Sequence, residues 1–362
     1  MKIALCLLGG GAMGAMFQIG AVAGLEDSVE GLSANAFDIF LGNSAGASVA
    51  AALSGGLPVQ RIYRAFLDPA DVYFGLERGH LLRVDLGEWR RTVLSAASAL
   101  RHGASSLLSG KKTEMPAKLS QELDRLFDSL PAGLFTLDGY ERFLEAFFVR
   151  RGVPNAFAEM PRALRIVAHD LDSGESQAFG AAGLDGVAVT RACIASMAVP
   201  PLFSPVRIGD RHYISSGSAE VEQLELAVSE GADVLIVVRP MVAISARAVP
   251  TGHGERDSLR DKGMMWVLNQ AMRIGVQRSV EAAVTQIRES RRAEVFVIQP
   301  NPEDSMLAMY NPASYDARRK MLEQAYRHTR ALLTRAFSEQ HPALARAGFV
   351  HRTSPSVPPP RL

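Results

Sequence analysis

The sequence has few of the residues that mark metal-binding, disulfide-rich or nucleic-acid-binding proteins. Its 362 residues include two cysteines, Cys6 and Cys193, and both lie within apolar runs, so neither a disulfide framework nor a zinc site is indicated. The 39 basic and 38 acidic residues leave a net charge of +1, which provides no general attraction for nucleic acid. We therefore expect no metal, no nucleic-acid partner and a cytoplasmic location.

Long hydrophobic runs are also missing. No stretch approaches the roughly 18 consecutive apolar residues that a membrane-spanning helix needs. Lys2 and the apolar residues 3–8 could pass for a signal peptide, but the run is short and leads into glycines that suit a loop of a folded domain. Because 48% of the residues are hydrophobic, the chain can bury a large core, and we expect a soluble globular protein.

What the sequence does contain is a repeated order of strand, glycine-containing turn and helix. Residues 3–8 and 37–41 each read as a buried strand, and each precedes a turn and a helix. This order is typical of an α/β fold with a mostly parallel central sheet and helices on both faces. Further strands are predicted at 165–169, 188–190, 212–214, 234–238 and 295–298.

The remaining segments divide the chain into regions. We assign residues 1–240 to one α/β domain with a mainly helical insertion at about 68–161, in which helices are predicted at 88–100, 115–130 and 138–149. The insertion combines basic and apolar side chains, which indicates either a solvated helix face or transient contact with a membrane surface. Residues 241–340 read as a helical extension with one strand packed on it, and residues 341–362 as a disordered tail ending in SPSVPPPRL.

One apolar stripe in the helical extension has the spacing of a long amphipathic helix. Its members recur every three or four residues, which predicts either a core face or an interface with a partner, such as a second copy in a homo-oligomer. They are Leu268, Met272, Val276, Val280, Val284 and Ile287.

A glycine-rich loop follows the first predicted strand. Gly9, Gly11 and Gly14 match G-x-G-x-x-G, the spacing of a dinucleotide-binding loop. That interpretation requires an acidic residue at the end of the second strand, and the sequence has Gly42, Asn43 and Ser44 there instead. The alternative is that the glycines let backbone N–H groups converge at a helix N-terminus, where they stabilise an oxyanion.

A serine between glycines follows the second predicted strand. In the stretch Gly42-Asn43-Ser44-Ala45-Gly46, glycines stand two residues before and two after the serine, as in a nucleophile elbow. A small-residue turn without chemistry is the other interpretation. A glycine loop and a serine elbow at adjacent strand ends would form two halves of one acyl-transfer site.

With these motifs the sequence resembles the patatin-like phospholipases. The resemblance extends over about two thirds of the chain, and rests on the residues 9–14 and 42–46, the run ASMAVPPLF at 195–203 and Gly231-Ala232-Asp233 before a hydrophobic strand. It implies a three-layer α/β sandwich that hydrolyses acyl esters of lipids with a serine–aspartate dyad and without a cofactor. Ser44 would match the nucleophile, with Gly42, Asn43 and Gly46 in its elbow. The oxyanion hole would match Gly9, Gly10, Gly11 and Gly14.

The sequence departs from the family at the second dyad position. Counting back from Gly231 to the family's Asp-Gly-Gly or Asp-Gly-Ala motif leads to Ser215-Ser216-Gly217, so a serine replaces the aspartate. A serine hydroxyl is a poor nucleophile without a base to accept its proton, and neutral Ser215 cannot serve. Replacement bases can be considered near two predicted strands, namely Asp210, His212, His169, Asp170 and Asp172.

Two functions from different classes stay open. The first is an acyl hydrolase that cleaves lipid or other hydrophobic carboxylic esters through Ser44, with activity impaired by the missing aspartate. The second is a catalytically inactive relative that binds lipid or a protein through the same cleft. Nucleotide binding by the glycine loop is a third, less favoured hypothesis.

Overall fold

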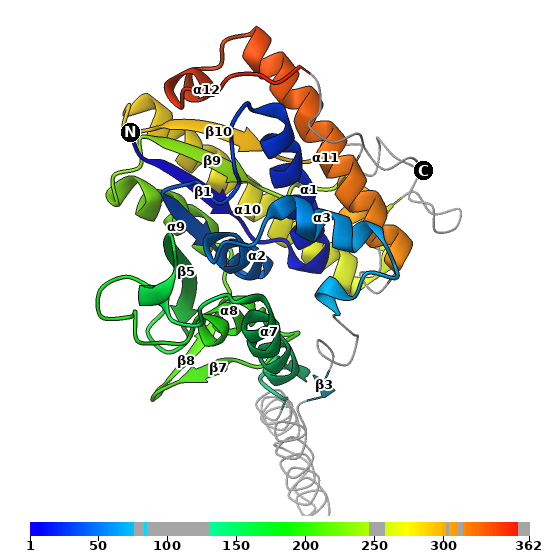
Figure 1. Cartoon of the computed structure of the whole chain (residues 1–362). Helices are drawn as coiled ribbons and strands as arrows, with labels where there is room; N and C mark the ends of the chain where they lie inside the picture. Colours follow the sequence, from blue (N-terminus) through cyan, green and yellow to red (C-terminus); the bar gives the residue numbers. More distant parts are fainter. Residues whose placement is uncertain (76–82, 85–129, 246–257, 302–303, 310–313, 354–362) are drawn as a thin grey trace, which may run out of the picture.

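The computed structural model describes residues 1–75, 83–84, 130–245, 258–301, 304–309 and 314–353. It has an eight-stranded sheet in the order β10-β9-β1-β2-β5-β8-β7, with β6 paired to β5 (Figure 1). The five strands from β10 to β5 are parallel, and β6, β7 and β8 join in antiparallel pairings. The predicted α/β fold with a mostly parallel sheet is confirmed.

The elements have the following bounds. The strands of the sheet are β1 (Ile3–Leu7), β2 (Ile39–Gly42), β5 (Ala163–Asp170), β6 (Ser176–Phe179), β7 (Val206–Ile208), β8 (Arg211–Ile214), β9 (Val234–Val238) and β10 (Glu294–Ile298). A separate pair joins β3 (Arg83–Val84) to β4 (Phe135–Thr136). The helices are α1 (Gly11–Ser28), α2 (Ala45–Ser54), α3 (Val59–Leu67), α7 (Asp138–Arg151), α8 (Val189–Met197), α9 (Ala219–Ser229), α10 (Met264–Glu289), α11 (Tyr315–Ser338) and α12 (Pro342–Arg346).

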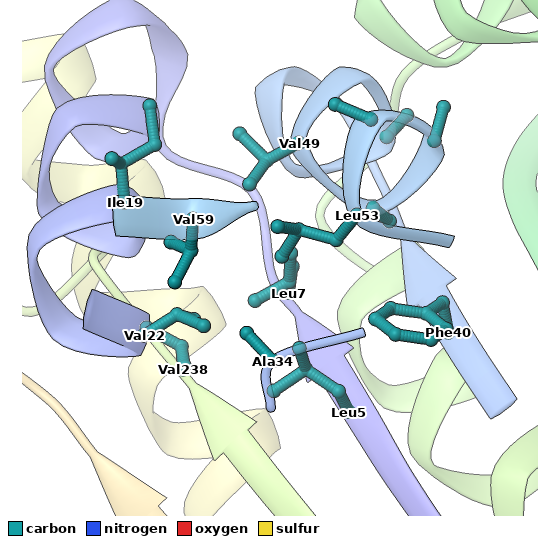
Figure 2. Close-up of a cluster of buried hydrophobic side chains, with 14 of the residues drawn as sticks. Leu5, Leu7, Ile19, Val22, Ala34, Phe40, Val49, Leu53, Val59 and Val238 are labelled. Carbon is teal, nitrogen blue, oxygen red and sulfur yellow. The ribbon is translucent and has the colours of Figure 1, made fainter. Parts of the chain in front are cut away.

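Alternate residues of the central strands face two separate cores, because successive side chains of a strand point to opposite faces. Leu5 and Leu7 of β1 pack with side chains of α1 and α2, as Figure 2 shows for Ile19, Val22 and Leu53. On the other face, Ala4, Cys6 and Leu8 pack against α9 and α10. The sheet is therefore covered on both faces, which confirms the three-layer sandwich.

The long helix of the C-terminal region buries only part of its predicted stripe. Val276, Val280, Val284 and Ile287 are buried against the sheet. Leu268 and Met272, nearer the start of α10, are 41% and 37% exposed. The core interpretation thus holds for the second half of α10.

Several predictions about single elements need correction or lie outside the described residues. Residues 188–190 were predicted as a strand, but Ala188 caps α8 and the next two residues begin this helix, which buries an apolar face against β5. The tail prediction is wrong for 342–346, which form α12 with Ala343 and Leu344 buried. The predicted helix 138–149 corresponds to α7, whereas those at 88–100 and 115–130 lie almost wholly outside the described residues.

Candidate active site

The carboxyl ends of β1 and β2 bring the two sequence motifs to one edge of the sheet. The two strands are parallel neighbours, with Leu7 opposite Gly42. The Asn43 N–H donates to the Leu7 carbonyl over 3.3 Å, which extends the pairing by one residue. The glycine loop and Ser44 follow immediately, so motifs that are well separated along the chain lie side by side (Figure 1).

Ser44 occupies the sharp turn between β2 and α2. Its backbone has φ 53° and ψ −131°, a region that residues other than glycine rarely adopt. A strained strand-to-helix turn of this kind is the geometry of a nucleophile elbow. The turn also requires small neighbours: a Cβ atom on Gly42 would lie 2.6 Å from the Gly46 carbonyl oxygen, and one on Gly46 would collide with the Leu7 carbonyl oxygen.

A buried serine of α8 holds this turn in place. The Ser44 N–H donates to Ser196 Oγ over 2.8 Å, and the Ser196 hydroxyl donates to the Val167 carbonyl of β5 over 2.5 Å. Ser196 is completely buried. The sequence placed Ser196 in a family-like run without giving it a role, and the contact became visible only when α8 was packed against β5.

The glycine loop lies directly against the serine turn. A Cβ atom on Gly9 would be 3.4 Å from Ser44 Cβ and 3.1 Å from Asn43 Nδ2. Gly10 is the residue before α1, and a Cβ there would be 3.0 Å from Pro240. Gly11 has φ 63°, and Gly14 donates its N–H to the Gly10 carbonyl. The first N–H groups of α1 have no partner within the helix, so the loop presents backbone donors beside Ser44.

Ser215, which the sequence predicts at the second dyad position, is attached to the end of the same helix, α8. The Ser215 N–H donates to the Ala198 carbonyl over 2.9 Å. Its neighbour Ser216 places Oγ 3.1 Å from Nδ1 of His169. The other nitrogen of this histidine, Nε2, lies 2.9 Å from the Glu222 carboxylate. Both ring nitrogens of His169 therefore have partners other than Ser44.

The remaining candidate bases have partners of their own or lie in exposed positions. Asp170 is 3.0 Å from Arg211 Nη1 and also accepts a hydrogen bond from the Asp172 N–H. Asp172, Asp210 and His212 are exposed. In the described part of the chain, none of these five side chains forms a hydrogen bond with Ser44.

No sequence pattern pointed to Glu220 as a site residue, although it lies at the serine turn. This first-turn residue of α9 is 1% exposed, and its Oε1 atom is 3.1 Å from the Cβ position of Gly9. Burial raises its pKa to about 8, against the opposing effects of Arg239, Arg273 and the Gly9 N–H. An acidic residue is common in the first turn of a helix, so the sequence offered no signal to single it out.

The described residues provide neither a metal site nor a ribose-binding acid at the expected place. No group of three or more His, Cys, Asp or Glu side chains within the described ranges is arranged to hold a metal ion. Strand β2 ends at Gly42 and is followed by Asn43 and Ser44.

No helix within the described ranges has both the length and the apolar character to cross a bilayer.

Comparison with solved structures finds only distant similarities. Among solved structures, VipD from Legionella pneumophila is 15% identical with a TM-score of 0.36, and the match covers 94% of this chain and 67% of that one. The type III effector ExoU is 17% identical with a TM-score of 0.35, covering 92% of this chain and 53% of that one. The chain thus spans about half to two thirds of these proteins.

Comparison of the sequence with curated proteins finds no match. Comparison with protein families does find one. Residues 5–221 match the family described as patatin-like phospholipase. This range contains the last three residues of β1, the glycine loop, the serine turn and Ser215, and it covers more than half of the chain. The chain therefore belongs to the patatin-like phospholipase family.

Proposed function

We propose that this protein is a serine acyl hydrolase that cleaves lipid or other hydrophobic carboxylic esters with Ser44 as the nucleophile. The observation that carries the proposal is the strained turn of Ser44 packed against Gly9. Membership of the patatin-like phospholipase family supports lipid esters as the substrate class.

The chemistry proceeds through an acyl-enzyme. Ser44 Oγ attacks the ester carbonyl carbon, and the developing oxyanion binds the backbone N–H groups of Gly10 and Gly11 at the N-terminus of α1. Collapse of the tetrahedral intermediate expels the alcohol and leaves the acyl group on Ser44. Attack by water then releases the fatty acid and restores the hydroxyl.

Exposed apolar side chains on α10 support a hydrophobic substrate and transient contact with a lipid surface. Met264, Met265 and Leu268 are 79%, 55% and 41% exposed, and they lie on the same helix as Arg273, whose charge acts on Glu220 beside Ser44. Large apolar side chains gathered at a surface commonly mark a site for lipid or another partner.

Labelling with a fluorophosphonate tests the nucleophile directly, because this probe phosphonylates activated serines. We expect labelling of the wild type and of Ser54→Ala, which removes another buried serine of the same region, α2. Ser44→Ala should abolish labelling. Absence of labelling in the wild type, or equal labelling of Ser44→Ala, would contradict the proposal.

The serines at 215 and 216 favour a second candidate function, an inactive relative that binds lipid or a protein partner. On this hypothesis Ser44 is too weakly activated to turn over ester. Restoring the family's residues with Ser215→Asp and Ser216→Gly should then raise turnover of a p-nitrophenyl ester strongly. Turnover that the double substitution leaves unchanged would remove the main support for inactivity.

A further inference from the structure

One buried carboxylate borders the same small space as the serine. The Cβ position of Gly9 is 3.1 Å from Glu220 Oε1 and 3.4 Å from Ser44 Cβ. Gly9 has no side chain, so both atoms border the space that a side chain at position 9 would occupy. A larger residue at position 9 would fill it.

The bonding of Glu220 does not account for its burial. Its Oε2 atom is buried and has no hydrogen-bond partner among the residues that the structure describes. Burying a carboxylate with one oxygen unbonded is costly, and most buried acids are compensated by direct ion pairs. The nearby Arg239 instead lies 3.5 Å from Glu281, and Arg273 donates to Asn269 Oδ1 over 2.6 Å. The two arginines therefore provide positive potential while bonding elsewhere.

The environment of Glu220 brings the pKa of its carboxyl group into the range that suits a general base. Burial is the largest effect on Glu220 and raises its pKa, whereas Arg239, Arg273 and the Gly9 N–H lower it, with a result of about 8. A base with a pKa near the working pH combines a useful ionised fraction with a strong affinity for the transferred proton.

We propose that Glu220 accepts the proton of Ser44, directly or through one water molecule, and replaces the aspartate missing at Ser215. This inference rests on the proposed function. His169 is less suited, because both of its ring nitrogens already have partners in Ser216, Ser218 and Glu222.

The proton path balances over one reaction cycle. As Ser44 Oγ bonds to the carbonyl carbon, its proton moves to the Glu220 carboxylate. Glu220 then gives this proton to the leaving alkoxide as the ester C–O bond breaks. In the second half, Glu220 takes a proton from the attacking water and returns it to Ser44 Oγ as the acyl group leaves. The net reaction is ester and water to acid and alcohol.

Glu220→Gln separates proton transfer from structure. The amide keeps the shape of the side chain and an oxygen that faces the Gly9 N–H, but it cannot accept the proton. We expect kcat/KM for a p-nitrophenyl ester to fall about 10²-fold or more, mainly in kcat. Glu220→Asp should retain more activity than Glu220→Gln. Glu222→Gln is the matched control. It also removes a carboxylate from α9, but this carboxylate bonds to His169.

The pH profile and a second substitution supply independent readouts. Because the ionised carboxylate is the active form, kcat/KM of the wild type should rise as the pH increases through about 8, and Glu220→Gln should lose this rise. Adding Ser215→Asp to Glu220→Gln should restore activity at least tenfold. A wild-type profile that is flat between about pH 6 and pH 10, or full activity in folded Glu220→Gln, would overturn the proposal.

The two proposals can fail separately. If fluorophosphonate labels Ser44 while Glu220→Gln is fully active, the nucleophile stands and Glu220 is rejected as its base. If the wild type is not labelled, both the proposed function and the role of Glu220 as a base are rejected.

Discussion

Removing the hydroxyl of Ser196 should loosen the serine turn and destabilise the fold. This hydroxyl accepts from the Ser44 N–H at 2.8 Å and donates to the Val167 carbonyl at 2.5 Å, in a completely buried position. Ser196→Ala leaves both backbone groups without this partner. A buried polar group left unpaired costs about 1–3 kcal/mol, so we expect the free energy of unfolding to fall by about 3 kcal/mol in total.

Ser54→Ala is the matched control, because Ser54 is also completely buried. Its hydroxyl donates to the Ala51 carbonyl, which still accepts from the Gly55 N–H when the hydroxyl is removed. We therefore expect a loss of about 1 kcal/mol or less. Urea denaturation measures both variants. Equal destabilisation of the two, together with unchanged fluorophosphonate labelling of Ser44 in Ser196→Ala, would refute the reasoning.

Three further substitutions have clear expected outcomes. Gly46→Ala should destabilise by about 1–3 kcal/mol or prevent folding, because its Cβ would collide with the carbonyl oxygen of Leu7; thermal denaturation and soluble yield test this. Gly275→Ala should stabilise by roughly 0.5–1 kcal/mol, since this position of α10 has open space around it, and a lower melting temperature would contradict it. The pKa of Asp233 is lowered by a hydrogen bond from the Lys2 N–H, so its stabilising effect is present above the ordinary value of 3.8 and is lost as the pH falls through the lowered pKa. The stability difference between the wild type and Asp233→Asn should therefore shrink in acid, and a difference that persists below pH 2 would argue against it.

The sequence was most informative where chemistry and pattern are local. A run of apolar residues predicted β9 at Val234–Val238, and turns rich in glycine marked the ends of β1 and β2. The spacing of the elbow glycines located Ser44. The weak strand predicted at 188–190 was wrong, because apolar residues in a short run are compatible with a strand or with a buried helix, and packing of α8 on β5 decided for the helix.

The amino-acid sequence by itself determined the mostly parallel α/β fold, the turns after β1 and β2, and the family of the protein. Those features depend on neighbouring residues and on side-chain periodicity. Only the tertiary structure decided that Glu220 shares a space with Ser44 and that Ser196 holds the turn. Contacts between residues far apart in the chain arise when helices and strands pack together, and the local pattern around each residue carries no record of them.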